Sequence, residues 1–247
     1  MCVQKIFLFM IISLTSLLLS SCAINDKQQK QLIESSQTLL KELNTKKLTE
    51  NDIAAGLKEA LKVASERVVS QLGKQNGYLK DKAIHIILPE NLQKAHETLN
   101  KLGLGHYTKE LETKMNRAAE LAAPKAKKIF YSAIKDLRWQ DVKAIYNGNN
   151  DAATQYFKNK MTPALKQMMK PLINQTLAQA GVIKAYQHAV KQYHSIPFVP
   201  RVKNDITGYV MEKGIYGLFY YLAKEEAAIR HDPAKRTTAL LRRVFTQ

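Results

Sequence analysis

The sequence has almost no cysteine. Of its 247 residues only Cys2 and Cys22 are cysteines, and both lie within the first 22 positions. A disulfide framework is therefore excluded for everything after Cys22, because no second thiol is present there. The stability of that part must come from apolar packing, which a hydrophobic content of 45% can supply.

Motifs that carry chemistry are also scarce. The histidines form neither an i, i+4 pair nor a His-Glu-x-x-His pattern, so the sequence predicts no metal site and no cofactor. Gly103-Leu104-Gly105 lacks the third glycine and the preceding strand of a phosphate-binding loop, which favours a turn between helices. No serine or cysteine lies in a nucleophile elbow, so no catalytic residue is predicted. The six histidines are His85, His96, His106, His188, His194 and His231.

Acidic residues are few beside the basic ones. Against 38 Lys and Arg there are 21 Asp and Glu, which gives a formal net charge of +17. Lys5 is the only charged residue before Cys22, so the remainder of the chain carries +16. This excess predicts an anionic partner, which could be nucleic acid, anionic lipid or lipopolysaccharide, an acidic polymer or an acidic protein.

The N-terminal segment has the pattern of an export signal. Its apolar run, Ile6 to Leu19, is too short to span a bilayer comfortably, for which about 20 residues are needed. It ends in Leu19-Ser20-Ser21-Cys22-Ala23, which resembles the bacterial lipobox. We therefore expect residues 1–21 to be a lipoprotein signal peptide and Cys22 to carry the lipid. The alternatives are a secretory leader with an incidental cysteine and a retained anchor helix.

A lipoprotein signal peptide implies that the protein resides in the bacterial cell envelope. Ala23, where an Asp would favour retention, predicts the outer membrane, with the protein facing the periplasm. Residues 22–47 are expected to form a basic, partly helical tether, whose lysines would be attracted to anionic headgroups. These lysines are Lys27, Lys30, Lys41, Lys46 and Lys47.

Residues 48–247 are predicted to form one helical domain. Thr49 reads as the N-cap of a helix that ends near Gly73, with apolar residues at helical spacing between them. Residues 83–88 look extended, but a single run of this kind cannot make a sheet. We predict an all-α, compact, non-solenoid array of about eight to ten helices without significant sheet. Later helices are expected at 89–103, around 111–122, 124–137, 139–146, 152–180, 182–193, from 205 and at 233–245.

Prolines modify two of these later segments. Pro163 and Pro171 should kink the helix at 152–180 or divide it. Residues 196–200, Ile-Pro-Phe-Val-Pro, are expected to form a stiff extended linker.

Charged residues near the C-terminus have simple interpretations. Glu225 and Glu226 are adjacent and so point about 100° apart on a helix, which makes a poor acid/base pair. Glu226 and Arg230 have the i, i+4 spacing of an ion pair. The basic residues of 230–243 could form an anion-binding face, although a solvated basic helix is the favoured interpretation. They are Arg230, Lys235, Arg236, Arg242 and Arg243.

Several strings together resemble bacterial proteins grouped as domain of unknown function 4197, often described as lipoproteins. The resemblance covers roughly residues 48–245 and implies a helical envelope protein, but no activity. The strings are Asp52–Leu61, Met115–Glu120, Asp151–Phe157, Gly217–Phe219 with Glu225-Glu226, and Asp232–Thr238.

Polar residues within these strings lie beside apolar helical faces. We predict that they form one buried hydrogen-bonded network, with a ligand pocket as the alternative. They are Asn116, Arg117, Glu120, Asp151, Thr154, Glu226, Arg230, Arg236 and Thr238.

Three functions are compatible with this sequence. The first is a non-catalytic, membrane-anchored lipoprotein that binds an envelope protein complex, lipid or anionic polymer. The second is an envelope hydrolase using Glu120, Asp151 or Glu226 as acid or base, which requires two carboxylates in one cleft. The third is nucleic-acid binding. A pI near 9.7 is compatible with it, but the predicted export from the cytoplasm makes it the least favoured of the three.

Overall fold

The computed structural model describes residues 48–246, except for the side chains at 160, 161, 164, 165 and 168. Over these residues the chain forms nine α-helices, two short 3-10 helices and no strand, so the predicted all-α class is confirmed. The leader, Cys22 and the basic tether lie outside the described residues. The helices are α3 (Glu50–Leu72), α4 (Glu90–Lys101), α5 (His106–Ala122), η1 (Ala123–Lys125), α6 (Ala126–Lys135), α7 (Trp139–Tyr146), α8 (Ala152–Gln179), α9 (Val182–His194), α10 (Ile206–His231), η2 (Pro233–Lys235) and α11 (Ala239–Phe245).

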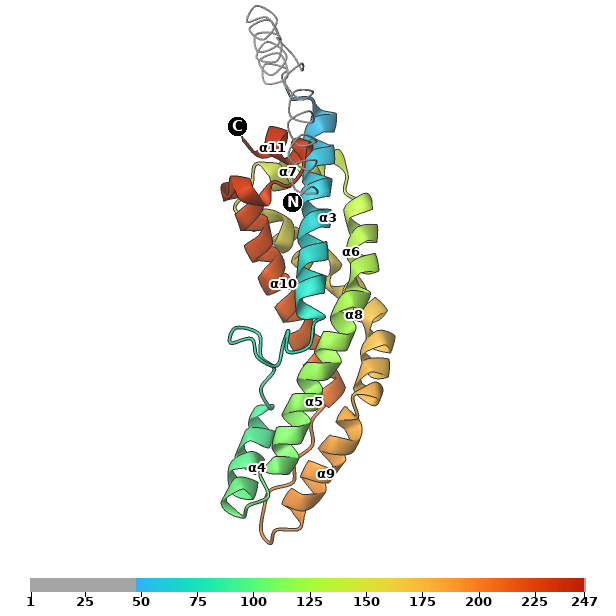
Figure 1. Cartoon of the computed structure of the whole chain (residues 1–247). Coiled ribbons are helices and arrows are strands. Elements are labelled where there is room, and N and C mark those ends of the chain that lie inside the picture. The colour runs from blue at the N-terminus through green and yellow to red at the C-terminus, as the bar shows by residue number, and fades with distance from the viewer. Residues whose placement is uncertain (1–47, 247) are drawn as a thin grey trace, which may run out of the picture. The chain divides into compact units, whose positions relative to one another are not determined.

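Helices α3, α5 and α10 organise the packing. Helix α3 contacts α10 and α6 and lies between them in Figure 1, whereas α5 lies between α4 and α9. The long helix α8 packs against both α10 and α5. The predicted apolar stripe of α3 faces the core, and its most buried members are Leu57, Leu61, Ala64, Val68 and Leu72.

The first described helix begins and ends where the sequence predicts. The Thr49 hydroxyl accepts a hydrogen bond from the Asp52 N–H at 3.1 Å, and the Asp52 carboxylate accepts one from the Thr49 N–H at 3.0 Å. This reciprocal capping box satisfies two N–H groups that the helix cannot pair. At the other end Gly73 is the C-cap, and Asn76, with φ of 68°, lies within the turn that follows.

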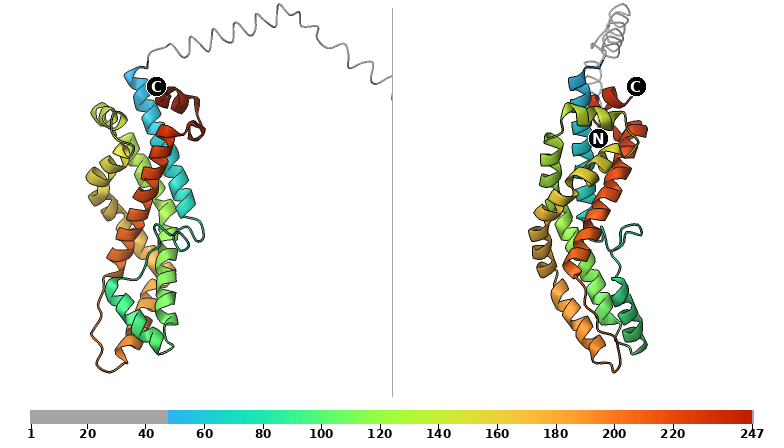
Figure 2. Two further views of the ribbon diagram at one scale, coloured as in Figure 1. Left: turned by 90° about the vertical axis from the view of Figure 1, so that its left-hand side faces the viewer. Right: turned by 180° about the vertical axis from the view of Figure 1, so that it is seen from behind.

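Of the two outcomes predicted for the prolines, a kink or a division of the helix, the division does not occur, because α8 continues through both of them. Each proline lacks the N–H that would pair with the carbonyl four residues earlier, at Asn159 and Gln167. Pro163, Pro171 and these two partners are all exposed, so water can satisfy the freed carbonyls. The helix bends instead of breaking (Figure 2).

The last predicted helix is interrupted. Asp232 caps η2 through the Ala234 N–H, and Thr238 caps α11 through the Leu241 N–H at 3.2 Å. Two caps six residues apart therefore start two helices where apolar periodicity alone predicts one.

Residues 196–200 also depart from the prediction, because they are not uniformly extended. Phe198 has φ of 62° and lies in the turn between α9 and α10. This turn and the one between α4 and α5 lie at the same end of the helical domain, and the first residues of α3 lie at the other end (Figures 1 and 2). Among residues 48–246, no helix is both long enough and apolar enough to cross a bilayer.

Candidate functional site

Most of the polar residues predicted to form one network divide into two groups. Asn116, Arg117 and Glu120 project from α5 toward residues 73–89, the irregular segment between α3 and α4 that we call the strap. Glu226 and Arg230 of α10 bind the ends of neighbouring helices.

Asn116 fixes the middle of the strap. Its Oδ1 accepts from the Ile86 N–H at 2.8 Å, and its Nδ2 donates to the Ile86 carbonyl at 2.9 Å. Both residues are almost fully buried. In a sheet, the N–H and carbonyl of Ile86 would pair with the backbone of a neighbouring strand. Here the side-chain amide of Asn116 makes both hydrogen bonds, so an extended segment is stable without a sheet.

Glu120 holds the start of the strap. One carboxylate oxygen accepts from the Tyr78 and Leu79 N–H groups, each at 3.1 Å, and the other is paired with Arg117. Arg117 also donates to Asn76 Oδ1 at 3.3 Å. The carboxylate is 4% exposed and its charge is balanced within the fold.

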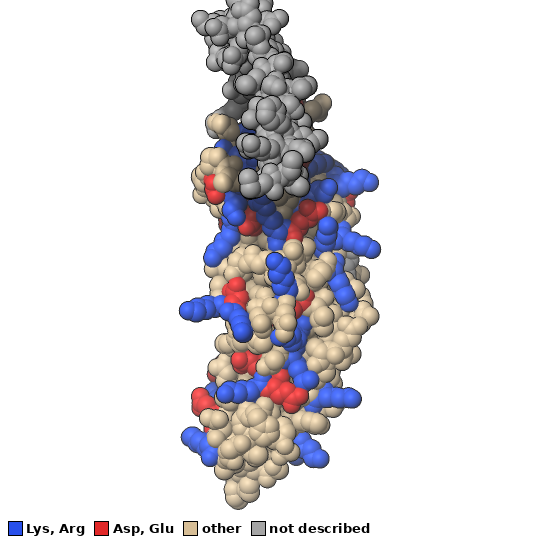
Figure 3. Space-filling model, in the orientation of Figure 1, with Lys and Arg blue, Asp and Glu red and all other residues tan. Residues whose placement is uncertain are grey.

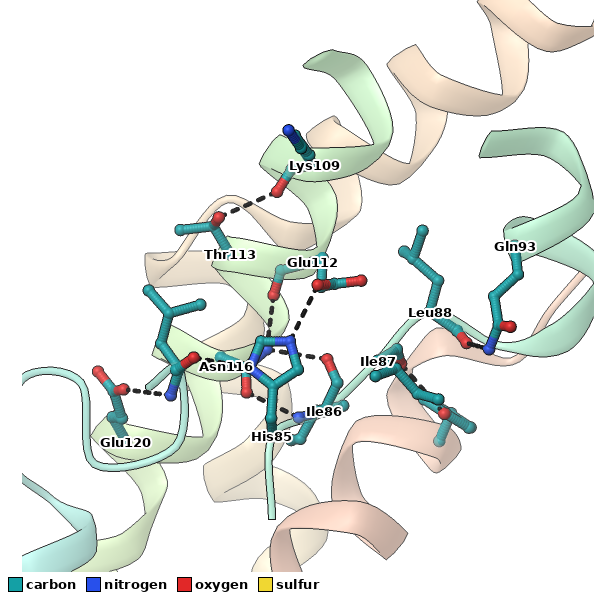
Figure 4. Close-up of polar contacts among 12 residues, drawn as sticks. His85, Ile86, Ile87, Leu88, Gln93, Lys109, Glu112, Thr113, Asn116 and Glu120 are labelled. Carbon is teal, nitrogen blue, oxygen red and sulfur yellow. Dashed lines mark hydrogen bonds and ion pairs between the residues drawn. The ribbon is translucent and has the colours of Figure 1, made fainter. Parts of the chain in front are cut away.

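Further contacts to the strap come from residues that sequence reasoning did not single out. His85 lies between the Leu79 carbonyl, 2.7 Å from Nδ1, and Glu112, 2.9 Å from Nε2 (Figure 4). The Tyr209 hydroxyl donates to the Ile87 carbonyl at 3.1 Å. No local pattern marks these residues, because their partners are distant in the sequence.

Two tyrosines anchor the strap to α10. The buried Tyr78 hydroxyl donates to the Gly214 carbonyl at 2.7 Å, and burial raises the pKa of Tyr78 well above its usual range. Tyr221 donates to the Asp81 carboxylate, and this hydrogen bond, with burial, raises the pKa of Tyr221 to about 12. A Cβ on Gly217 would lie 2.6 Å from the Tyr78 ring, so glycine makes room for the anchor.

Glu226 is the centre of the second group. Its two oxygens accept from the N–H groups of Ala153 and Thr154, each at 2.9 Å, at the start of α8. The Thr154 hydroxyl and Arg230 also donate to it, at 2.9 and 3.0 Å. Glu226, a residue of α10, therefore caps the N-terminus of α8. The predicted ion pair between Glu226 and Arg230 is confirmed.

The arginines of this group bind helix C-termini. Arg230 donates to the carbonyls of Ile145 and Tyr146 at the end of α7, at 2.8 and 3.2 Å. Arg236 donates to the Ile229 and Arg230 carbonyls at the end of α10, at 3.0 and 2.7 Å. Guanidinium groups placed there complement the negative end of the helix dipole.

The other basic residues of 230–243 are also engaged. Arg243 pairs with Asp52, Arg242 donates to the Arg236 carbonyl at 3.1 Å, and Lys235 lies 4.0 Å from Glu225. The C-terminal basic set is thus held mainly by contacts within the fold.

The two groups are well separated along α10. Tyr78, which Glu120 binds, contacts Gly214, and Gly214 lies twelve residues before Glu226, or about 18 Å at 1.5 Å per residue. The half-buried Asp151 accepts from Gln155 at 2.8 Å beside the second group. Glu120 and Glu226 therefore do not form the carboxylate pair of one cleft, and each is occupied by donors of the fold. Among residues 48–246, no three His, Cys, Asp or Glu side chains gather as metal ligands would.

Two grooves open beside these groups. One, of about 690 Å³, runs along α5 past Lys114, Arg117 and Glu120. The other, of about 360 Å³, lies on the surface between α8 and α10, with Tyr216 and Phe219 on one wall. Both grooves are open to solvent, and of the nine predicted residues only Arg117 and Glu120 line the first and only Thr154 lines the second.

The surface of α8, α9 and the following turn has one sign of charge. Residues 152–204, the acid-free segment, contain eight Lys and Arg and no Asp or Glu. Figure 3 shows the wider setting, in which Lys and Arg project over the drawn face and Asp and Glu form isolated patches. Seven basic residues of the acid-free segment are exposed, namely Lys158, Lys166, Lys170, Lys184, Lys191, Arg201 and Lys203.

Comparison with known proteins adds a family and no activity. A family model described as protein of unknown function (DUF4197) matches residues 47–246. No curated protein and no solved structure matches the chain.

Proposed function

We propose that this chain, which belongs to the DUF4197 family, is a non-catalytic lipoprotein of the bacterial envelope that binds an anionic membrane surface. The proposal rests on the charges exposed on the surface of the chain. Lipid on Cys22 anchors it, and the acid-free segment makes the contact. The observation that carries the proposal is the absence of any Asp or Glu from residues 152–204 beside seven exposed Lys and Arg.

Electrostatics favours this partner. A Lys or Arg close to an anionic bilayer contributes about 1 kcal/mol to binding, and the effect fades within a screening length of about 10 Å at 0.1 M salt. The acid-free segment adds no repulsive carboxylate of its own, and the nearest acidic residues in the sequence are Asp151 and Asp205 at its two ends. Glu212 of α10 lines the same groove as Lys158 and Lys166 and offsets part of their attraction to an anionic surface.

The carboxylates support a non-catalytic role. Glu120 holds the strap and Glu226 caps α8, so both have structural partners for their charge. A hydrolase would need a pair with unequal environments facing a substrate.

The test of binding uses the chain from residue 22 with Cys22→Ser, which removes the anchor. It should co-sediment with phosphatidylglycerol-containing vesicles at low salt, but not with phosphatidylcholine vesicles. It should be released at 1 M salt, where the screening length is about 3 Å. Equal sedimentation with both vesicles, or with neither, would contradict the proposal.

The anchor is tested in cells. The chain with Cys22 should fractionate with membranes and resist extraction at 1 M salt, whereas Cys22→Ser should be released by that wash. Release of both forms by the salt wash would contradict the proposal that a lipid on Cys22 anchors the protein.

A further inference from the structure

Phe198 is an unusual residue to find at a turn. Its side chain is fully exposed, with a relative exposure of 106%, and its backbone has φ of 62°. It follows Pro197, and turns that need a positive φ after a proline normally use glycine there. A bulky residue in this conformation is strained by about 1 kcal/mol or more. The fold gains no packing from Phe198, so packing does not explain its presence.

The surroundings of Phe198 are apolar and basic. At the same end of the domain the turn between α4 and α5 exposes Leu102 to 57% (Figures 1 and 2). The sequence from Thr98 to Lys109, which includes this turn, contains no carboxylate, and Phe198 itself lies within the acid-free segment. The exposed basic residues of the two turns are Lys101, Arg201 and Lys203.

We infer that this end of the domain, the apolar tip, inserts Phe198 into the interfacial region of an anionic bilayer. The inference rests on the proposed function and gives it a contact point. Aromatic side chains are favoured at the level of lipid headgroups, and flanking Lys and Arg are attracted to anionic lipid.

The turn is suited to insertion by its rigidity. Pro197 and Pro200 restrict the backbone on both sides of Phe198, so little conformational freedom is lost when the side chain enters the membrane. The exposed Lys101, Arg201 and Lys203 favour an anionic lipid surface over an apolar protein surface. The exposed carboxylates nearest to them in the sequence are Glu97, four residues before Lys101, and Asp205, two residues after Lys203.

The first test replaces Phe198 with glycine. Phe198→Gly removes the side chain and relieves the backbone strain, so its melting temperature should equal or exceed that of the parent chain. Its affinity for phosphatidylglycerol-containing vesicles should nevertheless fall about tenfold or more, as expected for the loss of one buried phenylalanine. Unchanged affinity would overturn the inference.

The second test reports depth directly. The chain from residue 22 contains no cysteine besides Cys22, so in the Cys22→Ser background Phe198→Cys offers one site for an environment-sensitive aromatic fluorophore, which takes the place of the phenyl ring. Gln187→Cys, at an exposed position of α9, is the matched control. The emission at position 198 should shift to shorter wavelength with anionic vesicles, while the emission at 187 should not.

The outcomes separate the inference from the proposed function. Co-sedimentation without a shift at 198 would overturn insertion and leave electrostatic binding standing. Equal shifts at 198 and 187 would also overturn it, because the tip would not be the inserted part. Failure to co-sediment at all would overturn both.

Discussion

At the scale of single residues, Glu226 serves two helices at once. It caps α8 and balances Arg230, which in turn caps α7. Its side chain is 5% exposed and that of Arg230 is 11% exposed, so removing the carboxylate leaves a nearly buried charge without compensation.

Glu226→Ala should therefore lower the free energy of unfolding by about 3 kcal/mol or more. The neighbouring Glu225 pairs with Arg67 at 3.2 Å in a more exposed position, so Glu225→Ala should cost less than about 1 kcal/mol. Urea unfolding followed by circular dichroism measures both. Equal losses would refute the capping role assigned to Glu226.

Tyr221 gives a prediction for alkaline pH. Its pKa is raised to about 12 in the folded state, from an ordinary value near 10, so its hydrogen bond to Asp81 stabilises the fold fully below pH 10. That contribution is lost as the pH rises from 10 through 12. Tyr221→Phe should be less stable than the parent chain at pH 8, and the difference should shrink toward pH 12. A difference independent of pH would contradict this assignment.

At the scale of elements, the helices were largely predictable and the strap was not. Local signals such as the Thr49 capping box and the apolar stripe of α3 locate helices because their partners lie within a few residues. The strap is held by residues such as Asn116 and Tyr209, which are 30 and 122 positions from their partners. Periodicity carries no information about such pairs. It also missed the break before α11, which depends on a second cap at Thr238.

Asn116→Ala tests how the strap is held. It leaves the buried N–H and carbonyl of Ile86 without partners, which should cost about 2 kcal/mol and raise the local hydrogen-exchange rate about 30-fold. Thr113→Ala, an exposed residue one turn earlier on α5, is the control and should leave exchange in the strap unchanged. Equal exchange in both variants would show that Asn116 does not fix the strap.

At the scale of the whole molecule, total charge and its placement give different information. The formal net charge of +17 predicts an anionic partner, but the net charge alone does not identify the surface that binds it. The fold removes several basic residues from consideration, since Arg230, Arg236 and Arg243 have partners within it. It leaves α8, α9 and the turn after them as the surface without carboxylates of its own.

The most direct test of this account compares two charge-matched triple variants in the Cys22→Ser chain. Each replaces three exposed lysines with glutamate, so both have the same net charge. The first changes the acid-free segment, at Lys170, Lys184 and Lys191. The second changes residues outside it, at Lys74, Lys128 and Lys143.

The quantity to measure is the affinity of each variant for phosphatidylglycerol-containing vesicles at one salt concentration. We expect the first variant to lose about 100-fold or more, from about 1 kcal/mol for each lysine removed, and the second to lose much less. Equal losses would show that binding follows net charge and not the acid-free segment, which would contradict the account.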